Sequence, residues 1–388
     1  MDHAASSASG TGANLPRSSQ VLGMDGAVMH SALVIGTGLM GTSVALALRA
    51  RGVTVYLRDV DSAAARTAAS LGAGTVQSPT ETVDLAIVAV PPPLIGKVLA
   101  DAQGGHLARH YTDVASVKAE TQHDVIALNC DTSCYIGGHP MAGASRSGPL
   151  RARGDLFEGR TWALTPTADT DTETLNTALE LVTLCGAVPV LMEAAAHDRA
   201  VALVSHAPHV VASLVAMRLD RAEEREVSLA GPGLRDLTRI AEADPQLWLD
   251  ILGGNAAVVA DLLDELGADL TEMVAGLRAM AATDEAKRSS GMKTVGTMLR
   301  RGKSGRGRIS GKHGTQPERF ESVTVMIGDQ QGELARLLTD ADRADVNIED
   351  IRIEHATGRQ AGLVHVSVAP GMTAPLREAL RIGGWHER

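Results

Sequence analysis

The sequence is poor in aromatic residues, which account for only 2% of its 388 positions. A core must therefore be built from alanine, leucine, valine and isoleucine. The hydrophobic share of 44% and the charged share of 21% are ordinary for a soluble globular protein. At this length we expect two or three domains, with ample apolar residues to build a core.

Cysteine is equally scarce, since the chain has only Cys130, Cys134 and Cys185. They form no C-x-x-C pair and their number is odd, which argues against a disulfide framework and favours a reducing compartment. No apolar run approaches the roughly 18 residues of a membrane span. No cationic segment followed by an apolar one is evident in the N-terminal region. We expect a cytoplasmic protein that has no membrane partner.

Positive charge is in deficit, with 36 Lys and Arg against 46 Asp and Glu, a formal net charge of −10. This balance argues against nucleic acid as the main partner. Residues 287–319 are the exception, because they hold ten Lys or Arg among glycines and serines. A nucleic-acid patch is one interpretation of them. Because they contain no aromatic side chain for stacking, we predict a solvated basic linker.

The remaining segments differ in their hydrophobic pattern. Residues 1–29 are rich in Ala, Ser, Gly and Thr and predict a flexible tail. Residues 30–190 alternate short apolar runs with Ala-rich helical segments, which predicts an α/β Rossmann-type domain. Residues 191–286 have a helical pattern and predict an all-α substrate and dimerisation domain. Residues 320–388 follow a β-α-β-β-α order and predict a ferredoxin-like α+β domain.

A glycine-rich turn opens the α/β domain. The strand at residues 32–35 runs directly into a G-x-G-x-x-G sequence and a helix. In such a unit the glycines permit the tight turn, the approach of a pyrophosphate and close packing of helix and strand. Free N–H groups at the start of the helix would hold the pyrophosphate. The predicted cofactor contacts in this turn are Gly36, Gly38, Leu39, Met40 and Gly41.

An acidic residue, Asp59, follows the second strand, 23 residues after the first glycine. An acid at this place accepts hydrogen bonds from both ribose hydroxyls and repels a 2′-phosphate, so NAD is favoured over NADP. The adjacent Arg58 weakens the preference for NAD over NADP, because its guanidinium could pair with a phosphate. We include Arg58 and Asp59 among the predicted cofactor contacts.

Pro91, Ser116 and His139 each follow the end of a further predicted strand. Ligands of an open α/β sheet bind beyond the carboxyl ends of its strands, so these residues should converge with Gly36 around one crevice. We predict that Pro91 and Ser116 contact the cofactor. His139 lies on a predicted Gly/Pro-rich loop, residues 137–149. A lone loop histidine is usually a polar surface residue, so its role depends on these surroundings.

Several separated motifs, in one unbroken order over residues 32–315, resemble the prephenate/arogenate dehydrogenase family of tyrosine biosynthesis. Four carry the likeness: Val34-Ile35-Gly36-x-Gly38-x-x-Gly41, Asp113-Val114-Ala115-Ser116-Val117-Lys118, Gly138-His139-Pro140-Met141-Ala142-Gly143 and Leu234-Arg235-Asp236-Leu237-Thr238-Arg239. Two more also resemble the family, Ser205-His206-x-Pro208-His209 and Asp244-Pro245-x-x-Trp248. The last 69 residues resemble an ACT domain.

The resemblance implies an oxidative decarboxylation. A hydride passes from the carbon that bears the 4-hydroxyl to NAD, and the ring carboxylate leaves as CO₂. It implies that His139 accepts the hydroxyl proton, which suits a neutral imidazole, and that Ser116 orients His139 and touches the cofactor. Arg239 matches the substrate arginine, whose guanidinium binds a carboxylate bidentately. The other substrate-binding residues that it implies are Arg235, His206 and Trp248.

The substrate stays open between prephenate and arogenate. Family members often carry an acid shortly after the G-H-P-x-A-G loop, where this chain has Ala144-Ser145-Arg146. Contacts assigned to that acid cannot be transferred, which leaves the side-chain end of the substrate undecided.

Three other interpretations have weaker support. A non-catalytic regulator that senses NAD and an amino acid would not need His139 and Ser116. A β-hydroxyacid dehydrogenase should use a lysine on the central helices, and residues 194–277 contain none. A zinc site at His206 and His209 lacks a third ligand at suitable spacing, so we predict no metal. Lys118 is interpreted as a helix cap if it has no other role.

The resemblance to an ACT domain implies a regulatory site at the loop before its first helix. The predicted contacts of tyrosine or another aromatic amino acid are Asp329, Gly332 and Asn347. ACT modules often pair across a dimer, and the helical domain should form an interface, so we expect a homodimer.

Overall fold

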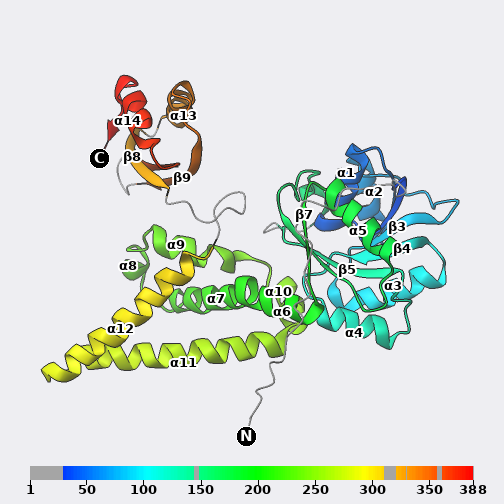
Figure 1. Ribbon diagram of the computed structural model, residues 1–388, viewed down its shortest axis with the longest axis horizontal. Helices are drawn as coiled ribbons and strands as arrows, with labels where there is room; N and C mark the ends of the chain where they lie inside the picture. Colours follow the sequence, from blue (N-terminus) through cyan, green and yellow to red (C-terminus); the bar gives the residue numbers. More distant parts are fainter. Residues whose placement is uncertain (1–28, 144–147, 310–319, 329, 356–360, 388) are drawn as a thin grey trace, which may run out of the picture. The chain divides into compact units, whose positions relative to one another are not determined.

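The computed structural model describes residues 29–143, 148–309, 320–328, 330–355 and 361–387. The chain divides into two compact units, residues 1–197 and 198–388, and each is described by itself (Figure 1). Met29 is buried in the core of the first unit, and its N–H donates to Glu180 Oε1 at 2.9 Å. The predicted flexible tail therefore ends before Met29, and its other residues lie outside the described ones.

A seven-stranded sheet forms the centre of the first unit, in the order β2-β1-β3-β4-β5-β6-β7. Neighbouring strands are parallel, except that β5 and β6 are antiparallel. The strand order reverses at β1, and doubly wound sheets bind ligands at such a switch point. The strands are β1 (Ser31–Ile35), β2 (Thr54–Arg58), β3 (Val83–Val88), β4 (Ala108–Asp113), β5 (Tyr135–Pro140), β6 (Thr161–Thr165) and β7 (Val188–Leu191).

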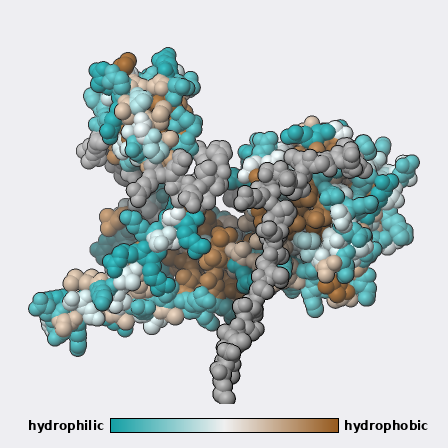
Figure 2. All heavy atoms as spheres, viewed as in Figure 1, coloured by the Kyte–Doolittle hydropathy of each residue, from teal (hydrophilic) through white to brown (hydrophobic). Residues whose placement is uncertain are grey.

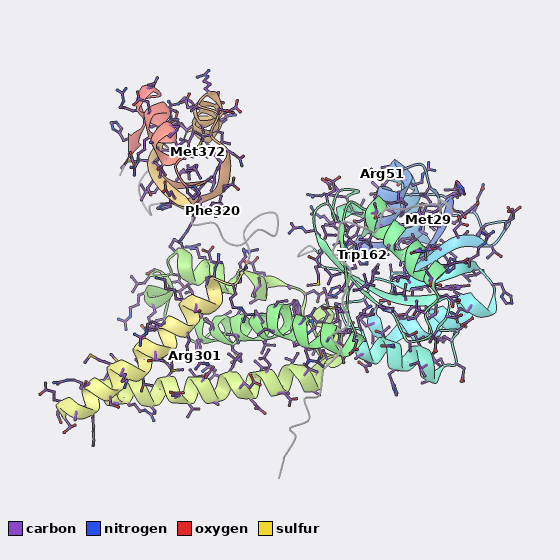
Figure 3. The ribbon with its side chains drawn as sticks, in the orientation of Figure 1. Met29, Arg51, Trp162, Arg301, Phe320 and Met372 are labelled. Carbon is purple, nitrogen blue, oxygen red and sulfur yellow. The ribbon has the colours of Figure 1, made fainter. Side chains whose placement is uncertain are left out.

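Helices pack on both faces of this sheet, because alternate residues of a strand point to opposite sides. The helices are α1 (Leu39–Ala50), α2 (Ser62–Ser70), α3 (Ile95–Gly104), α4 (Ala119–Ala127) and α5 (Thr172–Leu184), with short 3-10 turns η1 (Pro92–Leu94) and η2 (Pro149–Arg151). In β1, Ala32 and Val34 share a core cluster with residues of α1, α2 and α5, whereas Leu33 and Ile35 share another with residues of α3 and α4. Trp162 of β6 is fully buried in the first cluster (Figure 3).

The predicted alternation of strands and helices is confirmed, with one correction at β5. A loop was expected from Gly137, yet Gly137 to Pro140 continue the strand and pair with β6, so that His139 lies opposite Ala163. A Cβ added at Gly137 would lie 2.4 Å from Thr165 Oγ1, and one at Gly138 would lie 2.5 Å from the carbonyl oxygen of Asp113. The glycines here allow close strand packing and do not mark a turn.

The boundary between the two units falls inside the first helix of a helical segment, and the second unit continues as helices, as the sequence predicted. They are α6 (Ala194–Val201), the π-helical turn η3 (Ala202–His206), α7 (Ala207–Leu219), α8 (Glu224–Val227), α9 (Pro232–Thr238), the 3-10 turn η4 (Arg239–Glu242), α10 (Pro245–Gly253), α11 (Ala256–Met280) and α12 (Glu285–Arg306). Ala194–Leu219 has the length and composition of a membrane span, with a mean hydropathy of 1.7. This corrects the expectation that no run approaches that length, although core helices of globular proteins can have the same composition.

The prediction of a linker is wrong for residues 287–306, which are helical in α12. Asp284 caps this helix, since its Oδ1 accepts from the N–H of Lys287 at 2.7 Å. A Cβ added at Gly291 would lie 2.6 Å from the carbonyl oxygen of Gly276, so α11 and α12 approach closely. Gly291, one of the glycines that suggested a flexible linker, therefore lies at the contact between α11 and α12. Residues 310–319 of the predicted linker lie outside the described ones.

The C-terminal module has the element order β-α-β-β-α-β. Its elements are β8 (Glu321–Gly328), α13 (Glu333–Arg343), β9 (Ile348–His355), β10 (Ala361–Val368), α14 (Thr373–Ile382) and β11 (His386–Glu387). The strands form an antiparallel sheet in the order β11-β8-β10-β9. Val323, Leu337 and Leu376 share its core. The Arg336 guanidinium lies 3.6 Å over the Trp385 ring, whose Nε1 donates to Asp340 Oδ2 at 2.9 Å.

Candidate active site

The glycine-rich turn between β1 and α1 has the geometry of a phosphate-binding turn. Gly36 has a φ of +100°, and a Cβ there would lie 2.3 Å from the carbonyl oxygen of Ala89. A Cβ at Gly41 would lie 1.9 Å from the carbonyl oxygen of Gly36, whereas one at Gly38 would meet no atom within 4 Å. The turn therefore packs against β3 and α1 while leaving space at the N-terminus of α1, where free N–H groups attract anions. Leu39 is buried and Met40 half-buried, so Leu39 would reach a ligand through its backbone.

Asp59 follows β2 and is held from two sides. Its Oδ2 accepts from the N–H and the hydroxyl of Thr37, at 2.6 and 2.8 Å, and its Oδ1 accepts from the N–H of Asp61 at 2.9 Å. Thr37 was not singled out from the sequence, although it occupies a variable position inside the G-x-G motif. Arg58, next to Asp59, is exposed. The carboxylate is thus fixed beside the glycine-rich turn before any ligand arrives.

His139 of β5 contacts a second histidine. Its Nδ1 lies 2.8 Å from Nε2 of His197 in α6, and the two rings meet edge to face with centroids 5.0 Å apart. His139 is half-buried and His197 is only 1% exposed. The burial of His197 beside His139 fits a contact that orients the His139 ring. The sequence offered one weak signal for His197, namely a histidine-aspartate pair among apolar residues.

A buried charged cluster lies directly behind His139. Lys118 Nζ donates to Asp113 Oδ1 and, at 2.7 Å, to the carbonyl oxygen of Gly138, the residue before His139. The Tyr135 hydroxyl donates to Asp113 Oδ2 at 2.6 Å. Lys118 and Asp113 are 1% and 0% exposed. Burial, reinforced by the Asp113 carboxylate, holds the pKa of Tyr135 well above its usual value, so its hydroxyl stays protonated.

This cluster changes the interpretation of Lys118. It stands at the N-cap position of α4 but makes no side-chain cap hydrogen bond. Its ammonium group lies inside the domain and contacts the strand that carries His139. The expectation of a lysine that only caps a helix is wrong.

Pro91 and Ser116 lie where the strand order predicted. Pro91 is exposed after β3, and the half-buried Ser116 follows β4 by three residues. Because β1, β3, β4 and β5 are parallel, their carboxyl ends meet at one edge of the sheet. Gly36, Pro91, Ser116 and His139 therefore share this edge, as expected.

The predicted substrate residues lie on the helices of the second unit. Arg235 of α9 and Arg239 of η4 are exposed and four residues apart. The centroids of the His206 and Trp248 rings are 6.1 Å apart, edge to face. His209, which was considered from the sequence only as a zinc ligand, stacks on Trp248 with centroids 3.5 Å apart. Burial lowers the pKa of His209, so its ring is neutral near pH 7.

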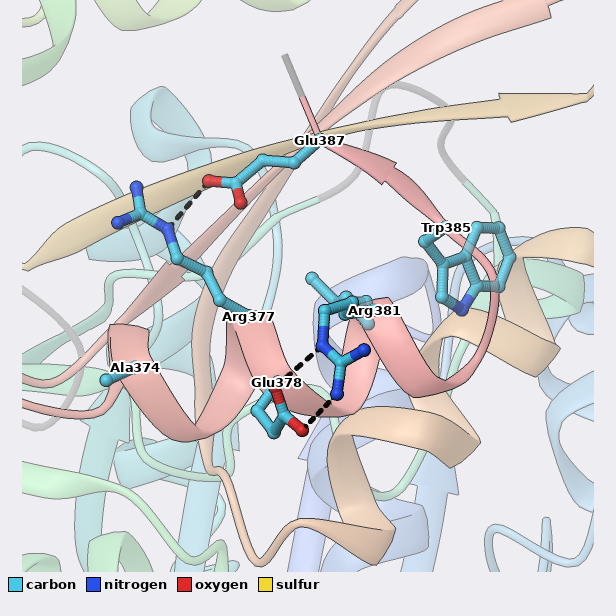
Figure 4. A pocket seen from close by; sticks show the side chains of 7 residues that line it. Ala374, Arg377, Glu378, Arg381, Trp385 and Glu387 are labelled. Carbon is cyan, nitrogen blue, oxygen red and sulfur yellow. Dashed lines mark hydrogen bonds and ion pairs between the residues drawn. The ribbon is translucent and has the colours of Figure 1, made fainter.

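The predicted regulatory residues are in the C-terminal module. Gly332 caps α13 with a φ of +92°, and the exposed Asn347 donates from Nδ2 to Glu349 Oε1 at 2.6 Å. Asp329 lies outside the described residues. A shallow cavity of about 400 Å³ is lined instead by α14 and β11, where Arg377 pairs with Glu387 and Arg381 with Glu378 (Figure 4). It involves none of the three predicted residues.

Within the described parts of both units, no group of three or more His, Cys, Asp or Glu side chains is arranged to hold a metal ion.

Sequence comparisons identify the family of this chain. Residues 44–191 match the prephenate dehydrogenase nucleotide-binding domain, and residues 193–289 match the prephenate dehydrogenase dimerization domain. The probable prephenate dehydrogenase NovF of Streptomyces niveus is 41% identical over 359 residues, 92% of this chain and 99% of NovF. The chain belongs to the prephenate dehydrogenase family. The resemblance inferred from its motifs is confirmed.

Solved structures are similar to the chain over about seven tenths of its length. Prephenate dehydrogenase from A. aeolicus, in complex with hydroxyphenyl propionate and NAD+, has a TM-score of 0.62 and 26% identity, and covers 73% of this chain and 99% of its own. Synechocystis arogenate dehydrogenase has a TM-score of 0.60 and 26% identity, and covers 71% and 98%. The match to NovF covers 92% of this chain, so it extends into the C-terminal module.

Proposed function

We propose that this protein catalyses the NAD-dependent oxidative decarboxylation of prephenate to 4-hydroxyphenylpyruvate. The observation that carries the proposal is His139, held by His197 at the carboxyl edge of the sheet that also bears the glycine-rich turn. Membership of the prephenate dehydrogenase family supports the substrate class.

The first unit fits NAD. Gly38 leaves open space at the start of α1 for a pyrophosphate, and Asp59 stands ready to accept from the ribose hydroxyls. Leu39, Met40 and Gly41 would contribute backbone groups, and Arg58, Pro91 and Ser116 would line the rest. NAD, when bound, supplies the hydride acceptor. A negative charge at Asp59 disfavours the additional 2′-phosphate of NADP.

His139 is the proposed proton acceptor. As the hydride leaves the carbon that bears the hydroxyl, the O–H proton passes to Nε2 of His139, because Nδ1 faces His197. The resulting ketone lets the ring C–C bond to the carboxylate break. CO₂ leaves, the bonding electrons complete the aromatic ring, and the phenolate oxygen takes its proton back from His139. Ser116 would hold the substrate hydroxyl in line with the imidazole of His139.

A substrate with carboxylates and a ring needs cations to bind the carboxylates and a planar surface to pack on the ring. Arg239 is the proposed carboxylate clamp, and Arg235 adds a second cation four residues earlier. Trp248, stacked on His209 and next to His206, would pack on the substrate ring. Arogenate is the alternative substrate, because an arogenate dehydrogenase is nearly as similar in structure as a prephenate dehydrogenase.

A steady-state comparison of both substrates with both cofactors tests the proposal. We expect the highest kcat/KM for prephenate with NAD. A higher kcat/KM for arogenate would assign the alternative. The absence of turnover with either substrate, in protein that binds NAD, would favour a non-catalytic sensor and overturn the proposal.

We further propose that the C-terminal module is an ACT domain that binds tyrosine or another aromatic amino acid near Gly332 and Asn347. Its β-α-β-β-α-β order and strand order support this assignment. The protein would act as a cytoplasmic homodimer. Titrating tyrosine against activity, with the full chain and with a chain ending at residue 319, tests the regulatory part. Equal activity at all tyrosine concentrations would contradict it.

A further inference from the structure

Thr37 lies inside the glycine-rich turn, between Gly36 and Gly38, and it is fully buried. The glycine-rich motif requires glycine on both sides of this position and leaves the position itself open. A buried hydroxyl needs a hydrogen-bond partner, because its burial without one costs free energy. The partner of the Thr37 hydroxyl therefore indicates what this residue does.

That partner is the carboxylate of Asp59, the residue after β2. Asp59 Oδ2 accepts from the Thr37 hydroxyl at 2.8 Å and from the Thr37 N–H at 2.6 Å. A second link joins the same two segments, since the N–H of Gly36 donates to the carbonyl oxygen of Arg58 at 2.8 Å. Thr37 is itself held by α1, because its carbonyl oxygen accepts from the Thr42 hydroxyl at 2.9 Å. The glycine-rich turn thus fixes the position of the carboxylate.

These contacts use most of the acceptor capacity of Asp59. An ionised carboxylate has about four lone-pair sites, roughly two on each oxygen. Oδ2 accepts twice from Thr37, and Oδ1 accepts once from the N–H of Asp61 at 2.9 Å. About one acceptor site remains, on Oδ1. Asp59 is half-buried, whereas Thr37 is fully buried, so a ligand can reach the carboxylate but not the hydroxyl that holds it.

The remaining acceptor site suits the adenosine ribose of a dinucleotide. In a fold of this type, the acid after the second strand binds the ribose 2′-hydroxyl of NAD. The same 2′ position carries a phosphate in NADP, and a carboxylate that cannot turn away repels this phosphate at short range. A fixed orientation of Asp59 therefore stabilises bound NAD and disfavours NADP through the same group.

We infer that Thr37 is a positioning residue for cofactor specificity, whose buried hydroxyl holds the Asp59 carboxylate toward the ribose 2′-hydroxyl of NAD and against the 2′-phosphate of NADP. The role belongs to the hydroxyl, since any residue except proline would supply the N–H. Without the hydroxyl, Oδ2 loses one of its two donors, and the carboxylate can turn toward solvent. The inference rests on NAD as the cofactor of the proposed function and does not depend on which substrate is oxidised.

Calorimetric titration of the full-length protein with NAD and with NADP tests this role without turnover. Thr37→Val keeps the shape of the side chain but removes the hydroxyl. We expect the Kd for NAD to rise about tenfold, because the carboxylate must then be ordered when NAD binds. The Kd for NADP should rise less than about twofold, because the freed carboxylate can turn away from the 2′-phosphate. An equal rise for both cofactors, or an unchanged Kd for NAD, would overturn the inference.

Two further titrations show whether the Thr37 hydroxyl acts through the 2′ position. NAD that lacks the adenosine 2′-hydroxyl has no group for Asp59 to accept from, so Thr37→Val should change its Kd by less than about twofold. Thr37→Ser retains a hydroxyl and should keep the Kd for NAD within about twofold of the wild type. A tenfold loss with the deoxy analogue, or a loss in Thr37→Ser as large as in Thr37→Val, would contradict the role.

Thr183→Val is the matched control. Thr183 is an exposed residue of α5 whose hydroxyl donates to the carbonyl oxygen of Leu179 at 2.9 Å, so this variant also removes a hydroxyl and its hydrogen bond. Both Kd values should stay within about twofold of the wild type. Equal effects of Thr37→Val on NAD and NADP, in a protein that turns over prephenate, would refute this inference alone. The expected Kd values in a protein that does not turn over prephenate would refute the proposed function alone.

Discussion

The nucleotide-binding unit and the helices of the second unit differ in how many large apolar side chains they leave exposed. The first unit buries a lysine and an aspartate, Lys118 and Asp113, together with a large aliphatic core. The second unit's helices leave many large apolar side chains exposed, and Figure 2 shows brown, hydrophobic patches on them among teal, hydrophilic surface. Examples on α11 are Leu266, Leu270 and Leu277, which share one helical face.

The comparison separates the groups that support His139 from the helical surface that is available for assembly. His139 has its orienting histidine and its supporting cluster inside the first unit. The helical part matches a dimerization domain and exposes an apolar surface of the kind that a second copy would cover. We expect changes in the first unit to act on catalysis and folding, and changes on the exposed helices to act on substrate binding and assembly.

The largest expected effect is at His139. His139→Asn should lower kcat by about 10²–10⁴-fold, because no group then accepts the hydroxyl proton. The affinity for NAD, measured by calorimetry, should stay close to that of the wild type. His123→Asn, at an exposed position of α4, is the control and should leave kcat unchanged. Equal turnover in the two variants would remove His139 from the mechanism.

Lys118 should matter mainly for folding. Lys118→Met leaves the buried Asp113 carboxylate without its cation, so the free energy of unfolding should fall by about 3–5 kcal/mol. Arg153→Met breaks an exposed pair with Asp155, 66% and 61% exposed, and should cost less than about 1 kcal/mol. Urea denaturation compares the two variants. Losses of similar size would contradict the distinct role of the buried cluster.

The sequence predicted the elements of the first unit because apolar runs and the glycine-rich turn are local signals. It could not predict the extension of β5, since Gly137 and Pro140 are typical of loops and only the pairing with β6 makes them a strand. The burial of Lys118 was missed because its partner Gly138 is 20 residues away. His197, 58 residues from His139, gave almost no local signal.

The sequence predicted that this unit is helical, but it predicted neither the extent of α12 nor the contacts between the helices. The Gly-rich, basic composition of residues 287–306 suggested a linker, yet the close approach of Gly276 and Gly291 makes them part of a helix pair. The stacking of His209 on Trp248 joins α7 and α10, which no pattern within either helix indicates.

Arg239 should show a smaller effect, confined to the substrate. Arg239→Ala is expected to raise KM for prephenate about 10–100-fold, because a carboxylate loses its bidentate partner. The KM for NAD should not change. Steady-state kinetics of Arg218→Ala, at an exposed arginine on α7, provides the control. An unchanged KM in Arg239→Ala would refute the clamp.

The smallest expected effect concerns assembly. Leu270→Asp places a charge on the exposed apolar face of α11, where Leu270 is 63% exposed, and should weaken the dimer by at least about tenfold. Light scattering across a dilution series would detect this as a shift toward monomer. Leu71→Asp, 42% exposed in the first unit, should leave the dimer intact. Identical dilution curves would place the dimer contact elsewhere.

The most direct test of the central claim is the stoichiometry of the reaction in the presence of prephenate and NAD. The wild-type protein should release one CO₂ for each NADH formed, and His139→Asn should form both at a rate lower by about 10²-fold or more. NADH formation without CO₂, or equal rates in the two proteins, would contradict the account.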